Sequence, residues 1–168
     1  MVVNNRMLFF VVFLACLGLM GFGLYLQHVK HLEPCPLCIL QRIAFIAIGA
    51  TALAGAIHDP ARSGWAAYGS LLVIFSLLGG GVAAWQVRLQ HLPPDLVPEC
   101  GPGLDYMLDA LPLAKVLPMI FKGSGECAEV TWTFLGFSIA QWALAWFVLF
   151  ALAGGAAIFR RPQRNYFR

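Results

Sequence analysis

The sequence predicts an all-α membrane protein, a bundle of four transmembrane helices with two cysteine-bearing loops on one side of the membrane. The first observation behind this prediction is the composition. Of the 168 residues, 60% are hydrophobic and 11% are charged, with a mean hydropathy of +0.77, values typical of integral membrane proteins. The second observation is that four segments reach the roughly 20 mostly apolar residues that a helix needs to cross a bilayer. We therefore expect one integral membrane domain over residues 1–168.

The four segments define the predicted topology. They cover about residues 7–26, 39–57, 65–85 and 135–159. Because the number of spans is even, both termini lie on one side of the membrane. The loops at about residues 27–38 and 86–134 then lie together on the opposite side.

A third observation, the distribution of basic residues, predicts the orientation, because cytoplasmic segments carry the excess of Lys and Arg. One side of the membrane collects Arg6, Arg62, Arg160, Arg161, Arg164 and Arg168. On the other side, Lys and Arg are diluted by Asp and Glu. We therefore expect cytoplasmic termini and outer cysteine loops. The formal net charge of +3 follows from this topology and is no argument for nucleic-acid binding; the arginine tail is interpreted as a topology determinant that touches anionic lipid.

The first span carries Gly18, Gly21 and Gly23, small residues that allow close contact between helices. It is longer than the core of a signal peptide, and no clear cleavage site follows it. We expect it to be retained as a helix. Cys16 lies inside this span and is interpreted as a small apolar core residue without a chemical role.

The first outer loop ends in a Cys-x-x-Cys pair directly before the second span. Cys35 and Cys38 can close a small disulfide ring, and such pairs often hold one sulfur as a reactive thiolate. If the helix begins near Cys38, then Arg42 lies one turn further on the same face and brings a permanent cation close to that sulfur. A nearby guanidinium favours the thiolate. An ordinary loop disulfide beside an anchoring arginine, or half of a zinc site, fits the same residues.

The second and third spans are joined by a tight turn that contains Pro60 and Gly64, both of which break helices. The third span opens at Trp65 and Tyr68, aromatic residues suited to a membrane interface. In the fourth span, Gln141 requires a hydrogen-bond partner, which a neighbouring helix or a polar ligand could supply.

The second outer loop is too long to be a simple connector. Its first part, HLPPDLVPECGPG, is rich in Pro and Gly and should hold Cys100 in an extended, accessible segment that a thiol of another protein could attack. Apolar residues in 104–122 suit a short amphipathic helix on the membrane surface, although Pro112 and Pro118 should interrupt it. Packing of this segment against the loop itself is the alternative. The last part presents Cys127 after a Gly-Ser-Gly turn.

Four of the five cysteines therefore fall on the outer side: Cys35, Cys38, Cys100 and Cys127. Disulfides persist outside the cytoplasm, here in a bacterial periplasm. Two structural disulfides would fit this arrangement. A Cys-x-x-Cys beside an arginine at the membrane surface, together with a second pair in a pliable loop, favours redox chemistry instead.

Four stretches of the chain resemble the bacterial disulfide bond formation protein B (DsbB) family: EPCPLCILQR, PECGPG, KGSGECAEVTWTFLG and the QW of the fourth span. The resemblance spans nearly the whole chain. It implies a protein-dithiol:quinone oxidoreductase of the bacterial inner membrane. Such an enzyme reoxidises the periplasmic thioredoxin-like protein DsbA and passes the electrons to membrane quinone, ubiquinone with menaquinone as the alternative.

The resemblance also implies roles for five residues. Cys100 and Cys127 match the second-loop pair, with Cys100 forming the mixed disulfide with DsbA. Cys35 and Cys38 match the first-loop pair, with Cys35 exchanging with Cys127 and Cys38 facing the quinone ring. Arg42 matches an arginine close to the quinone, where it would stabilise negative charge.

Some positions depart from the family pattern, and other functions stay open. Relatives often carry a histidine near the start of the second loop; here the nearby residues are Gln86 and His91, to which we assign no role. Gln41 stands where an acid can occur. A paralogue that serves a dedicated partner is one alternative, and a non-enzymatic membrane protein with structural disulfides or a zinc site is another.

Overall fold

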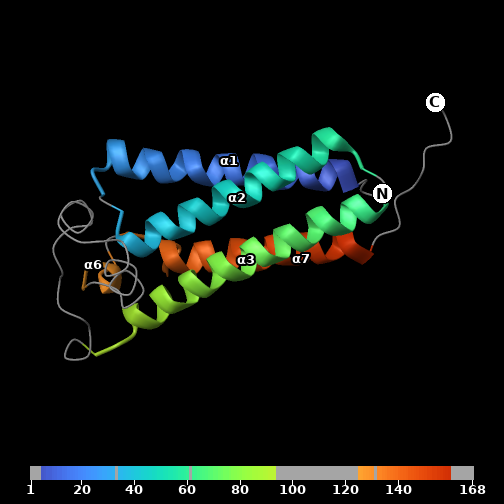
Figure 1. The fold of residues 1–168 in the computed structure, drawn as a ribbon. Helices are drawn as coiled ribbons and strands as arrows, with labels where there is room; N and C mark the ends of the chain where they lie inside the picture. Colours follow the sequence, from blue (N-terminus) through green and yellow to red (C-terminus); the bar gives the residue numbers. More distant parts are fainter. Residues whose placement is uncertain (1–4, 33, 61, 94–124, 131, 160–168) are drawn as a thin grey trace, which may run out of the picture.

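Four long helices lie side by side along a common axis (Figure 1). The computed structural model describes residues 5–32, 34–60, 62–93, 125–130 and 132–159. The long helices are α1 (Asn5–Val29), α2 (Pro36–His58), α3 (Arg62–Gln90) and α7 (Ile139–Phe159). Each is long and apolar enough to cross a membrane, so the predicted four-helix membrane bundle is confirmed.

The connections alternate between the two ends of the bundle. Figure 1 shows the start of α1, the α2–α3 connection and the end of α7 at one end. The α1–α2 connection and the short helix α6 (Gly125–Ala128) lie at the other, which we call the cysteine end. Cys100 and the segment 104–122, where an amphipathic helix was predicted, lie outside the described residues.

The start of α2 follows from its first residues. Cys35 has extended backbone angles, φ −64° and ψ 160°, and its sulfur accepts a hydrogen bond from the backbone N–H of Cys38. Pro36 occupies the first helical turn, where a missing N–H costs no hydrogen bond. The helix therefore begins inside the Cys-x-x-Cys pair, slightly before the predicted start at residue 39.

The fourth span begins later than predicted, at Ile139 instead of about residue 135. The strands β1 (Thr133–Phe134) and β2 (Phe137–Ser138) form a hairpin, and both turn residues have positive φ, 54° at Leu135 and 83° at Gly136. Positive φ at both positions suits the twist of a two-residue hairpin but interrupts a helix. The predicted start was wrong because the residues of this turn are as apolar as those of the span that follows, so hydropathy does not separate them.

A capping box then starts α7. The backbone N–H of Ser138 donates to Gln141 Oε1 at 2.8 Å, and the backbone N–H of Gln141 donates to Ser138 Oγ at 3.3 Å. This reciprocal pair satisfies N–H groups that the first helical turn leaves unpaired. The partner that Gln141 requires is thus its own helix terminus.

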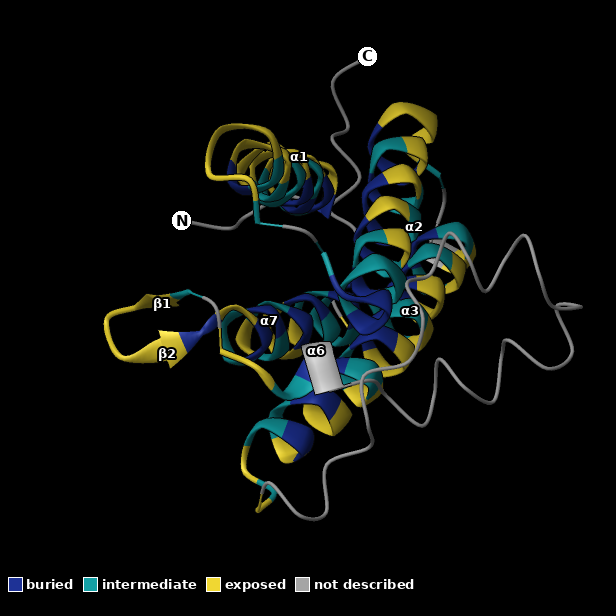
Figure 2. Ribbon diagram, turned by 90° about the vertical axis from the view of Figure 1, so that its left-hand side faces the viewer, coloured by how far each residue is buried: buried dark blue, intermediate teal, exposed yellow. Residues whose placement is uncertain are grey.

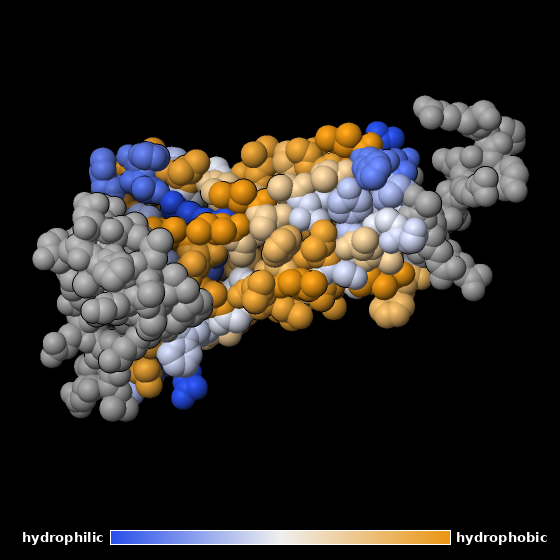
Figure 3. Space-filling view, in the orientation of Figure 1, coloured by the Kyte–Doolittle hydropathy of each residue, from blue (hydrophilic) through white to orange (hydrophobic). Residues whose placement is uncertain are grey.

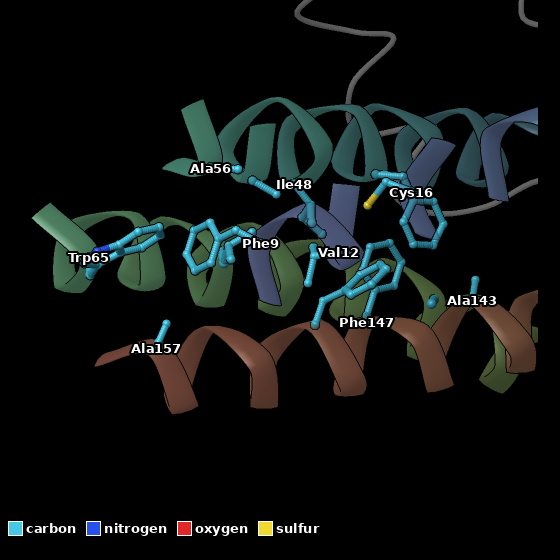
Figure 4. Close-up of a cluster of buried hydrophobic side chains, with 14 residues drawn as sticks. Phe9, Val12, Cys16, Ile48, Ala56, Trp65, Ala143, Phe147 and Ala157 are labelled. Atoms are coloured by element: carbon cyan, nitrogen blue, oxygen red, sulfur yellow. The ribbon is translucent and has the colours of Figure 1, made fainter. Parts of the chain in front are cut away.

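The main core runs along the inside of the bundle (Figure 4). Phe45 of α2 stacks on Phe147 of α7 with ring centroids 4.3 Å apart, and Phe9 of α1 meets Trp65 of α3 edge to face at 5.0 Å. Buried residues face this interior, whereas the outward faces and most of the β1–β2 hairpin are exposed (Figure 2). The visible face carries a hydrophobic band at mid-length and hydrophilic residues toward both ends (Figure 3), as expected for helices surrounded by lipid.

Glycines allow the close approach of the helices. A Cβ added at Gly69 of α3 would lie 2.8 Å from the carbonyl oxygen of Gly154 in α7, and one at Gly154 would lie equally close to that of Gly69. Further along α3, a Cβ at Gly79 would collide with the Phe147 ring and lie 2.8 Å from Ala44 Cβ. Because association inside a bilayer depends on close packing, these positions hold the bundle together.

We expect Gly79→Ala to destabilise the protein by about 1–3 kcal/mol, the usual cost of overpacking a filled core. Thermal unfolding in detergent measures the effect. Gly81→Ala is the matched control, because a Cβ at Gly81 meets nothing within 4 Å and alanine favours helix. Equal melting temperatures for the two variants would contradict the packing described here.

Candidate functional site

Three cysteine sulfurs meet at the cysteine end of the bundle. The Sγ atoms of Cys35 and Cys38 lie 2.9 Å apart, farther than the about 2.05 Å of a disulfide bond, so the structure holds the pair as thiols. Cys127, from α6, is hydrogen-bonded to Cys35. The fold thus brings the second-loop cysteine onto the Cys-x-x-Cys pair, and Cys35 is the sulfur that both others contact.

The three cysteines differ in how far they are buried. Cys35 and Cys127 are buried in a small apolar cluster with Leu37 and Leu89, and Cys127 has no exposed surface. Cys38 is only partly buried and lies at the edge of this cluster. Cys127 is therefore the enclosed residue of the three, and Cys38 is the one with the most exposed surface.

The neighbouring sulfurs also control the proton on Cys35, which precedes the membrane-spanning part of α2. The hydrogen bond with Cys127 is the main reason that the pKa of Cys35 is raised above its ordinary value. The hydrogen bond with Cys38 and burial raise that pKa further, because the first binds the protonated form and the second penalises the charged one. Cys35 therefore keeps its proton more firmly than an exposed thiol does.

Among the described residues, Gln86 of α3 contacts the pair with a polar side chain. Its Nε2 lies 3.4 Å from the sulfurs of both Cys35 and Cys38, and its Oε1 accepts a hydrogen bond from Gln41 Nε2 at 2.6 Å. Both glutamines are buried. The sequence analysis assigned neither of them a role. The feature that could have pointed to them is that each is a polar amide at the end of an apolar span.

Arg42 lies one turn beyond Cys38 on α2, but its hydrogen bonds run to α1. Nη1 donates to Gln27 Oε1 at 2.6 Å, and Nη2 donates to the backbone carbonyl of Gly23 at 3.1 Å. A Cβ at Gly23 would approach the guanidinium to 3.6 Å. The structure thus holds the guanidinium between α1 and α2, half-buried, while the amide of Gln86 touches the Cys38 sulfur.

Cys16 and His91 make contacts with residues other than the three cysteines. Cys16 is a buried member of the main core, where its Cβ would be 3.2 Å from a Cβ added at Gly49, in agreement with its interpretation as a small core residue. His91 is exposed, and its Nδ1 lies 2.7 Å from the carbonyl oxygen of Val87. Within the described part of the chain, no group of three or more His, Cys, Asp or Glu is placed to hold a metal ion.

We expect Cys127→Ala to lower the pKa of Cys35, because it removes the hydrogen bond that contributes most to the raised value. The midpoint of the pH dependence of Cys35 alkylation should move to lower pH, as followed by site-resolved mass spectrometry. Cys16→Ala, a change of the same kind in the main core, should leave the midpoint where it is. A midpoint unaffected by Cys127→Ala would show that the two sulfurs do not interact.

The chain is similar to known proteins over most of its length. The family model described as "Disulfide bond formation protein DsbB" matches residues 5–157. Proteins named Disulfide bond formation protein B are similar over most of the chain. That of Hahella chejuensis is 52% identical, covering 95% of this chain and 97% of its own, and that of Azoarcus sp. is 50% identical, covering 96% of each. The chain therefore belongs to the DsbB family of disulfide bond formation proteins.

Proposed function

We propose that this protein oxidises a periplasmic dithiol protein of the DsbA type and passes the two electrons to membrane quinone. Membership of the DsbB family supports disulfide-generating oxidoreductase activity in a multi-pass membrane protein. The observation that carries the finer proposal is the contact of Cys127 with the Cys35–Cys38 pair at one end of the bundle. In this proposal the cysteine end faces the periplasm of a bacterial inner membrane, and the termini are cytoplasmic.

The relay starts with a disulfide between Cys100 and Cys127. A thiolate of the partner attacks the Cys100 sulfur and releases Cys127 as a thiolate; the partner's second thiolate then displaces Cys100 and closes the partner's disulfide. The partner has lost two electrons and two protons. Cys100 and Cys127 now hold the electrons, with the protons taken up there or by solvent.

The next exchange moves the electrons to the Cys-x-x-Cys pair. The Cys127 thiolate attacks Cys35 in the Cys35–Cys38 disulfide and releases Cys38; Cys100 then attacks Cys127, releases Cys35 and restores the loop disulfide. This order is supported by the contacts of Cys35, which touches both Cys127 and Cys38, as the central sulfur of an exchange must.

When bound, the quinone supplies an acceptor for two electrons and two protons and becomes a quinol. The residues that would hold it are Arg42 and Cys38. Cys38 is the partly accessible sulfur of the three. The contacts of Arg42 with Gln27 and Gly23 use one N–H on each terminal nitrogen, whereas a guanidinium has five N–H groups. Arg42 can therefore keep both hydrogen bonds to α1 and still donate to a carbonyl oxygen of the quinone.

The experiment that tests the function uses the purified full-length protein with reduced DsbA and ubiquinone-1, and follows quinone absorbance and thiols together. We expect one quinone lost per DsbA disulfide formed. Cys38→Ser should stop quinone loss, because no sulfur is left to complete the pair. Cys100→Ser should stop DsbA oxidation while ubiquinone-1 still oxidises the Cys35–Cys38 pair. Cys16→Ala should turn over like the unmodified protein.

Two outcomes would contradict the proposal. Bound zinc or unchanging disulfides, with no quinone loss, would identify a non-enzymatic membrane protein with a zinc site or structural disulfides. Rapid oxidation of the Cys35–Cys38 pair by ubiquinone-1 with no oxidation of DsbA would identify a paralogue with a dedicated partner.

Arg42→Ala should raise the KM for ubiquinone-1 roughly tenfold or more, since a hydrogen bond to a charged group contributes about 1.5–3 kcal/mol. The KM for DsbA should not change. Arg88→Ala is the matched control, because Arg88 is exposed and lies over the Trp85 ring of α3. An unchanged KM for ubiquinone-1 in Arg42→Ala would remove Arg42 from the quinone site.

A further inference from the structure

An ordered pair of amides adjoins the two sulfurs of the Cys-x-x-Cys. Gln41 on α2 and Gln86 on α3 are both buried, at 4% exposure each, in a part of the bundle that is otherwise apolar. Gln41 donates to Gln86 Oε1 at 2.6 Å, and Gln86 Nε2 lies 3.4 Å from the sulfurs of Cys35 and Cys38. Burying two amides is costly unless their hydrogen bonds are satisfied, so the sulfurs are part of what keeps Gln86 there.

The contact with Gln41 fixes which way the amide of Gln86 faces. A glutamine amide has an acceptor oxygen and an NH2 group with two donors. The N–H of Gln41 is bound to the oxygen at 2.6 Å. This oxygen lies 3.8 Å from Cys38 Sγ, whereas the NH2 nitrogen lies closer to the sulfurs, at 3.4 Å from each of them. The two sulfurs are only 2.9 Å apart, so they share this donor group at the same distance.

These hydrogen bonds are not equally strong in the two redox states of the pair. A reduced cysteine can carry negative charge as a thiolate, and a hydrogen bond to a charged acceptor is roughly twice as strong as one to a neutral acceptor. The sulfurs of a disulfide are neutral. In the low dielectric of a buried site this difference is larger than in water. The amide therefore stabilises the dithiol form more than the disulfide form.

We propose that Gln86 is a catalytic residue of the Cys35–Cys38 centre, donating to both sulfurs when they are reduced, and that Gln41 is the residue that positions it. Stabilising the reduced form raises the reduction potential of the pair, the principle that makes DsbA a strong oxidant. Electrons are then drawn from the loop cysteines toward the Cys-x-x-Cys. This inference rests on the proposed function in that the Cys35–Cys38 pair is taken as the one that cycles.

The test measures the redox equilibrium of that pair with glutathione, in the full-length chain carrying Cys100→Ser and Cys127→Ser in every sample. The Cys35–Cys38 disulfide and two glutathione thiols give the dithiol and one glutathione disulfide, so two electrons and two protons are transferred. Gln86→Met keeps the length of the side chain and removes the donors. We expect it to raise the ratio [GSH]²/[GSSG] at half-reduction about tenfold, a potential about 30 mV lower.

Gln90→Met is the matched control. It makes the same substitution one turn further along α3, where Gln90 accepts from Ser138 Oγ at 2.8 Å. We expect this variant to change the ratio less than twofold. A Gln86→Met ratio equal to that of Gln90→Met would overturn the proposal.

Gln41→Leu provides a second test if Gln86→Met does not fold, as judged by thermal unfolding in detergent. Without the N–H of Gln41, the Gln86 amide is no longer held with its donors toward the sulfurs. The half-reduction ratio should rise about threefold, and an unchanged ratio would overturn the proposal. Neither measurement contains quinone or DsbA, so a shifted ratio in a protein that cannot reduce quinone would refute the proposed function while supporting this role of Gln86.

Discussion

The hydrogen bond from the Cys38 backbone N–H to the Cys35 sulfur marks the place where the membrane bundle and the thiol chemistry meet. It begins α2, and with Pro36 in the first turn it fixes both cysteines at the terminus of a transmembrane helix. The contacts of Cys127 and Gln86 are made to sulfurs held in this way. Had α2 begun one turn later, both cysteines would belong to a loop, and neither contact would have a fixed target.

Cys35, Cys38 and Cys127 carry the same thiol group but differ in burial. Cys35 is enclosed and contacts sulfur on two sides, whereas Cys38 is partly open at the edge of the cluster. The polar groups are divided similarly, because Gln86 contacts the sulfurs and Arg42 is held against α1. Under the proposed function, the sulfurs would exchange on one side of this arrangement and the quinone would approach from the other.

Composition predicted the bundle well because crossing a bilayer constrains about 20 consecutive residues at once. The β1–β2 hairpin was missed since the backbone angles of Leu135 and Gly136, not their hydropathy, stop the helix there. Gln86 could not be assigned from the sequence, because its partners on α2 are brought to it only by packing of α2 on α3. The partners of Arg42 on α1 are unpredictable for the same reason, whereas Cys35 and Cys38 carry their own signal in their spacing.

The complete burial of Cys127 has a consequence for which thiols can react with it. Disulfide exchange requires one sulfur to touch another, and a dissolved thiol such as glutathione has no open approach to a side chain without exposed surface. The folded chain therefore shields this sulfur sterically from dissolved thiols. Cys35 of the same chain contacts this sulfur, whereas the surrounding side chains keep small-molecule thiols away from it.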